Sequence, residues 1–78
     1  MAHPRTIPAL VATPEERADL DTLARSRTAP VRRVTRAQIL CASLDGTSIP
    51  GIASRLHQPE PTVRRSVRQA LATGVRRA

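Results

Sequence analysis

Residues 48–74 read SIPGIASRLHQPEPTVRRSVRQALATG, and this pattern predicts two short helices with a sharp break between them. Ser48 is a residue type that begins helices, because its hydroxyl can accept a hydrogen bond from a free backbone amide of the first turn. Pro59 and Pro61 disfavour helical backbone angles at the residues just before them, so the chain breaks there. The expected helices span residues 48–57 and 60–73, and Gly74 ends the second.

The spacing of apolar residues in this pair is typical of a helix-turn-helix. Ala53 is small where a second helix would cross closely, and Ile52 flanks it on the core side. Val63 follows ten residues after Ala53 and would anchor the second helix in the same core. The expected buried face of the second helix consists of Val63, Val67, Ala70 and Leu71.

The opposite face of the second helix is rich in arginine. In a helix-turn-helix the second helix enters the major groove of DNA. There Arg can bind guanine O6 and N7, Gln can bind adenine N6 and N7, and further arginines hold phosphates. The residues that we expect to contact double-stranded DNA are Thr62, Arg64, Arg65, Arg68 and Gln69, with Arg55 from the preceding helix.

Two more helices are predicted upstream. Thr13-Pro14-Glu15-Glu16 carries a capping residue, a proline suited to the first helical position and a glutamate that completes a reciprocal cap. A helix at 14–26 follows, and a second at 30–45 is ended by Gly46. This second helix is apolar on two sides, with Ala37 on its main face and Ile39 on the far one, so it should be central. The prediction is an all-α, small four-helix, homeodomain-like domain over residues 13–75, with a disordered arm at 1–12 and a basic tail at 76–78.

Charge is distributed unevenly along the 78 residues. Thirteen basic residues, all arginine, stand against six acidic ones, for a net charge of +7. Residues 1–30 balance to zero, so residues 31–78 carry the whole excess. Arginine suits bidentate phosphate and guanine contacts, although a GC-rich genome would favour it equally well. The clustering favours a nucleic-acid partner.

Composition also excludes several classes of protein. There is no Phe, Tyr or Trp, so aliphatic residues must form a thin core, and Cys41 is interpreted as a small core residue. No apolar run is long enough for a membrane span or resembles a signal peptide, which predicts a cytoplasmic protein without a membrane partner. No catalytic constellation, metal-ligand spacing or phosphate loop occurs. We therefore expect no enzyme activity, no cofactor and no small-molecule substrate.

From Thr13 to Gly74 the chain resembles the N-terminal helix-turn-helix domain of bacterial insertion-sequence transposases of the mariner-like superfamily. The resembling stretches are Pro14-Glu15-Glu16-Arg17, Arg25-Ser26-Arg27-Thr28-Ala29-Pro30, Arg36-Ala37-Gln38-Ile39-Leu40, Asp45-Gly46, Ile52-Ala53-Ser54-Arg55-Leu56 and Pro61-Thr62-Val63-Arg64-Arg65. The resemblance implies sequence-specific binding to the terminal repeats of a mobile element, in a bacterial cytoplasm and near the nucleoid. In that family a separate downstream domain with three catalytic carboxylates cuts and joins DNA, and it is absent from these residues.

The chain departs from the family at three informative positions. His57 stands where the family has a turn glycine, and Ser66 and Ala70 stand where it has a Trp and a Phe. Two alternatives are therefore kept beside DNA binding. One is a small helical protein-interaction module, with a homodimer left open, and the other is a non-functional transposase remnant.

Overall fold

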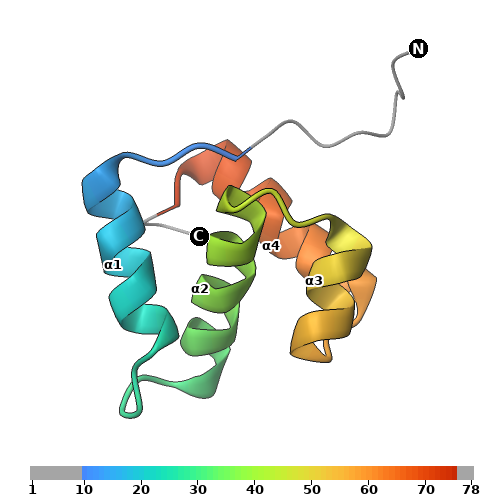
Figure 1. Ribbon diagram of the computed structural model, residues 1–78, viewed down its shortest axis with the longest axis horizontal. Helices are drawn as coiled ribbons and strands as arrows, with labels where there is room; N and C mark the ends of the chain where they lie inside the picture. Colours follow the sequence, from blue (N-terminus) through green and yellow to red (C-terminus); the bar gives the residue numbers. More distant parts are fainter. Residues whose placement is uncertain (1–9, 76–78) are drawn as a thin grey trace.

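The computed structural model describes residues 10–75, and this part of the chain contains four helices and no strand (Figure 1). The helices are α1 (Pro14–Ala24), α2 (Val31–Leu44), α3 (Ile49–Leu56) and α4 (Glu60–Thr73). The prediction of an all-α chain with four helices is confirmed, and every helix end lies within two residues of the expected position. Most of the predicted arm and the whole predicted tail lie outside the described residues.

The helix starts follow the capping residues. The Thr13 hydroxyl accepts a hydrogen bond from the Glu16 amide at 3.1 Å, and the Glu16 carboxylate accepts one from the Thr13 amide at 2.9 Å. These two bonds satisfy amides that the first turn leaves without helical partners. The Ser48 hydroxyl accepts from the Gly51 amide at 3.2 Å and begins α3 in the same way. The sequence therefore determines both starts locally.

A residue with positive φ follows each of three helices, α2, α3 and α4. Gly46 follows α2 with a φ of 90° and Gly74 follows α4 with a φ of 92°, as predicted. His57 follows α3 in the left-handed region, at φ 56° and ψ 43°. The next amide, of Gln58, donates to the Ala53 carbonyl at 3.0 Å, which is the bond that closes a Schellman-type helix end. His57 therefore adopts a backbone conformation that glycine usually adopts at a helix end.

α2 is the central helix, as its two apolar faces predicted. In Figure 1 it lies between α1 and α3, and α4 crosses behind it. One cluster of buried residues joins α1 and α2 to the C-terminal half of α4; it consists of Leu10, Leu20, Ala37, Leu40, Ala70 and Val75. A second joins α2, α3 and the N-terminal half of α4; it consists of Ile39, Ala42, Ile52, Val63 and Val67.

Two predictions about burial are wrong. Leu71 is 37% exposed and Ser66 is buried, so the buried face of α4 is rotated toward Ser66 relative to the prediction. The chain reverses at Gly74, and buried Val75 supplies the apolar group at this end of the core instead of Leu71. The predicted disordered arm is also too long, because Leu10 is buried and belongs to the first cluster. The aliphatic core thus includes Leu10, which precedes α1, and Val75, which follows α4.

Between residues 10 and 75, none of the helices combines the length and the apolar character that crossing a lipid bilayer requires.

Candidate nucleic-acid interface

The exposed face of α4 carries two arginines that point away from the core. Val63 and Val67 are at most 2% exposed and fix the buried side of the helix. Arg65 and Arg68 are exposed, and each lies roughly 100° to 200° around the helix from these valines, at about 100° per residue. The packing of two valines therefore aims both guanidinium groups into solvent.

Arg64 and its neighbours extend this face. Arg64 is half-buried on one flank of α4, with its guanidinium 3.7 Å from the Glu60 carboxylate. Within residues 10–75, no acidic residue forms an ion pair with Arg65 or Arg68. A shallow hollow on the outer face of α4 is lined by Pro61, Arg64, Arg65, Arg68 and Gln69. Of the six residues predicted to contact DNA, four thus share one hollow, and a fifth, Thr62, is exposed on the same helix.

The sixth residue, Arg55, does not join this group. It lines a different hollow, between α1, α2 and α3, together with Asp21, Arg25 and Gln38. No residue of α4 contributes to that hollow. Arg55 occupies the last turn of α3, and that turn faces α1 and α2 as well as solvent. The structure therefore does not bring Arg55 together with the α4 residues that share one hollow.

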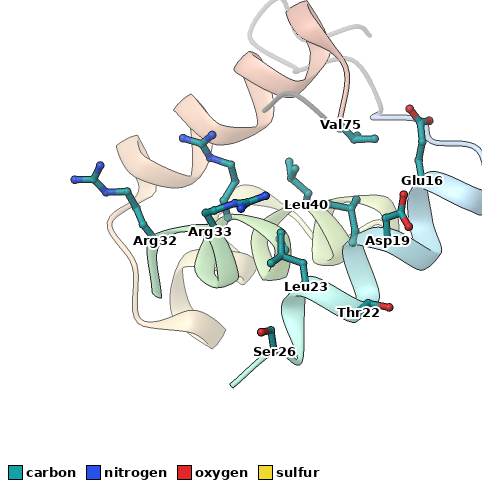
Figure 2. A pocket seen from close by; sticks show the side chains of 12 residues that line it. Glu16, Asp19, Thr22, Leu23, Ser26, Arg32, Arg33, Leu40 and Val75 are labelled. Atoms are coloured by element: carbon teal, nitrogen blue, oxygen red, sulfur yellow. The ribbon is translucent and has the colours of Figure 1, made fainter. Parts of the chain in front are cut away.

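A second group of arginines was not singled out from the sequence. Arg32, Arg33 and Arg36, in the first two turns of α2, line a hollow of about 790 Å³, which Figure 2 shows from close by. Apolar residues form much of its surface; they are Leu20, Leu23, Ala37, Leu40 and Val75. Figure 2 shows Arg32 and Arg33 at one end of this hollow and the α1 carboxylates of Glu16 and Asp19 at the other. The i, i+1, i+4 spacing of the arginines on one helix face was the available signal.

The arginine of α1 has a different environment from those of α2 and α4. Arg17 donates to Asp21 at 3.1 Å within α1, and to both carboxylate oxygens of Asp45 at 2.9 and 3.4 Å. Asp45 follows α2, so this fork ties α1 to the end of α2. The hydrogen bonds to Asp45 and Asp21 raise the pKa of Arg17. Arg17 is therefore a structural residue, already occupied by two carboxylates.

Cys41 closes the same network. Its thiol donates to the Asp21 carboxylate at 3.4 Å. The pKa of the Cys41 thiol is raised to about 11, mainly because the thiol is partly buried and to a lesser extent because of this hydrogen bond. The hydrogen bond from Arg17, followed by that from Cys41, holds the pKa of Asp21 below its usual value. A thiol that stays protonated at neutral pH is a poor nucleophile, and Cys41 packs against the first cluster as predicted.

In the part of the chain that the structure describes, no group of three or more His, Cys, Asp or Glu side chains is placed to hold a metal ion. Comparison of the chain with protein-family models, with curated proteins and with solved structures finds no match in any of the three.

Proposed function

We propose that this protein binds double-stranded DNA in a sequence-specific manner through a helix-turn-helix formed by α3 and α4. In this proposal α4 is the recognition helix and enters the major groove, where Arg65, Arg68 and Gln69 meet base edges. Arg64 and Thr62 contact the backbone and set the register. The proposed activity is binding alone.

One observation carries the proposal. Arg65 and Arg68 are exposed on the outer face of a helix whose inner face is anchored by Val63 and Val67. Neither arginine has an acidic partner among the described residues. Unpaired guanidinium groups on a rigid helix face can form bidentate hydrogen bonds without first breaking an internal ion pair. A recognition helix needs this property.

The turn between α3 and α4 supports the same proposal. It spans residues 57–59, a length typical of helix-turn-helix motifs. His57 adopts the left-handed conformation that glycine adopts most readily, and it stands where the resembling transposase domains have a turn glycine. Ser66 and Ala70, at the positions where the resembling domains have aromatic residues, are both buried, so small side chains fill these positions in the core.

The test is a salt titration of duplex binding, measured by fluorescence anisotropy with a labelled double-stranded oligonucleotide. Target sites are first selected from a random duplex library. We expect log affinity to fall linearly with log salt, with a slope of about −0.9 per phosphate neutralised. Arg65→Gln and Arg68→Gln should each weaken binding and relax base preference at one position of the selected site, by about 1–3 kcal/mol for a bidentate guanine contact.

Arg25→Gln is the matched control, because it removes the same charge. Arg25 lies in the hollow that excludes α4. We expect it to bind with nearly wild-type affinity and unchanged sequence preference. Equal losses in Arg25→Gln and Arg65→Gln would contradict the assignment of α4 as the reading helix. Failure of the wild-type protein to bind any duplex at low salt would contradict the function itself.

A second candidate function is a protein-interaction module. It is supported by the hollow of about 790 Å³ beside α1, whose apolar lining a partner could cover. The two functions separate in one pair of measurements. A protein that dimerises in light scattering and shows no duplex binding at low salt would favour the interaction module.

A further inference from the structure

Three arginines of α2 that are not part of the proposed recognition helix line the hollow beside α1. Arg32 and Arg33 are exposed and Arg36 is half-buried, all within the first two turns of α2. Within residues 10–75 none of the three forms an ion pair. Three neighbouring cations without a counter-charge repel one another in the free protein. Such a group is expected where an external anion supplies the missing charge.

These arginines lie on the side of α2 that α4 crosses. Ile39 packs with Val63 and Val67, and Leu40 packs in the cluster of Ala70 and Val75, so α4 runs over the surface of α2 near residues 39 and 40. Arg36 is one helical turn before these residues on the same surface. The arginine group therefore lies beside α4, just ahead of the crossing.

The hollow that contains Arg25 and Arg55 lies on the other side of α2. Gln38 lines that hollow, and it is two residues from Arg36, or about 200° around the helix. The charges of the molecule are thus divided by α2. One side carries the arginines of α2 and α4 together, and the other carries Arg25 and Arg55.

We propose that Arg32, Arg33 and Arg36 bind phosphates of the same duplex that α4 reads, so that DNA is held by two helices. This inference rests on the proposed function. The guanidinium fork matches phosphate oxygens bidentately. The far end of the hollow carries the carboxylate of Glu16, which repels phosphates. The duplex backbone therefore follows α2 and turns away from α1.

The two groups of arginines have different tasks, and this difference makes the inference testable. Contacts to phosphate set affinity and register but carry no sequence information, whereas contacts to base edges discriminate between sequences. Substitutions in α2 should therefore weaken the binding of all duplexes alike. Substitutions in α4 should weaken the selected duplex more than an unrelated one.

The experiment uses Arg32→Gln, Arg33→Gln and the double variant in the full chain, because both residues are exposed and their replacement should leave the fold intact. Affinity for a selected duplex and for a scrambled duplex is measured by anisotropy across a salt series. Each substitution should lower affinity for both duplexes by roughly five- to tenfold at 0.1 M salt and flatten the salt slope by about 0.9. The ratio of the two affinities should not change.

Arg25→Gln is again the control, and circular dichroism checks that each variant is folded. If the wild-type protein binds DNA and the double variant binds with the same affinity and slope, the inference about α2 is wrong while the proposed function stands. If Arg25→Gln loses as much as Arg33→Gln, net charge rather than position explains the loss, and the inference also fails. If the wild-type protein binds no duplex, both proposals fail together.

Discussion

The two sides of α2 are packed in different ways. On the α3 side the cluster is closed, and Ile52 and Val63 are 0% exposed. On the α1 side the cluster borders a hollow of about 790 Å³, and its outer members, such as Leu20 at 6%, retain a little exposure. Both clusters are entirely aliphatic, so side-chain type does not account for the difference. Each cluster also joins three helices, so the difference lies in enclosure: α2, α3 and α4 surround Ile52 and Val63, whereas Leu20 of α1 borders the hollow.

The arginines of the molecule differ in whether a carboxylate holds them. On the α1 side Arg17 is held by Asp21 and Asp45, whereas the arginines of α4 that face solvent have no described acidic partner. Surface ion pairs of this kind contribute modestly to stability, yet they determine which arginines are available to a ligand. An arginine of this protein is therefore structural or available for binding according to whether a carboxylate lies near it, because the residue type is the same in both cases.

The largest effect should come from opening the closed cluster. Ile52→Ala should destabilise the fold by about 3–5 kcal/mol, since it leaves a cavity that three helices cannot easily fill. Leu20→Ala should cost only about 2 kcal/mol, because water can enter from the neighbouring hollow and no sealed cavity forms. Denaturant unfolding followed by circular dichroism measures both.

Ile52→Ala can exceed the total stability of a domain this small. Ile52→Val is therefore the companion variant, with an expected cost of about 1 kcal/mol. Equal costs for Ile52→Ala and Leu20→Ala would show that the two sides of α2 are packed alike, and would contradict the difference in packing described above.

An intermediate effect is expected at the end of α3. His57 has a φ of 56°, a conformation that costs a residue with a Cβ atom about 1 kcal/mol or more relative to glycine. Glycine relieves this strain, but it also has more freedom in the unfolded chain, which offsets part of the gain. His57→Gly should therefore stabilise the fold by about 0.5–1 kcal/mol net. For a domain of this size that raises Tm by roughly 2–8 °C.

Gly46→Ala is the converse variant at the end of α2. Its φ is 90° and nothing lies within 4 Å of an added Cβ, so any loss reports backbone conformation alone. We expect a loss of about 1 kcal/mol. A stabilised Gly46→Ala or a destabilised His57→Gly would contradict the conformational explanation.

The smallest effect should appear in the pH dependence of the Arg17 network. Because the folded-state pKa of Asp21 is lowered, its contribution to stability is complete above its ordinary pKa of about 3.9 and is lost as pH falls through the folded-state value. Arg17→Gln removes the main cause of this shift. The Tm difference between wild type and Arg17→Gln should therefore be largest near pH 6 and should shrink as the pH falls below about 3.9.

Arg65→Gln is the matched control for that measurement, because it removes the same charge from a residue without a described ion pair. Its Tm should follow the wild-type profile over the whole range. A gap between wild type and Arg17→Gln that persists at pH 2 would mean that Arg17 acts through packing of its aliphatic stem instead of through Asp21 and Asp45.

Much of the fold could be predicted from local chemistry. Thr13 and Ser48 begin helices, and Gly46 and Gly74 end them, through hydrogen bonds and backbone angles that involve only near neighbours. The orientation of Arg65 also follows from the periodicity of α4. Burial of Ser66 instead of Leu71 could not be predicted, because it depends on where the chain turns after α4 and on which neighbour fills the space.

Of the candidate site, the arginine-rich outer face of α4 could be predicted from sequence periodicity, since a helix with valines on one side must present the other side to solvent. Three features depend on helix packing instead: Arg55 lies apart from this face, two carboxylates hold Arg17, and Arg36 lies on the side of α2 that packs against α4. Helical periodicity is set within a few residues and can be read along the chain. The side of α2 on which each arginine lies relative to another helix depends on how helices distant in sequence pack together.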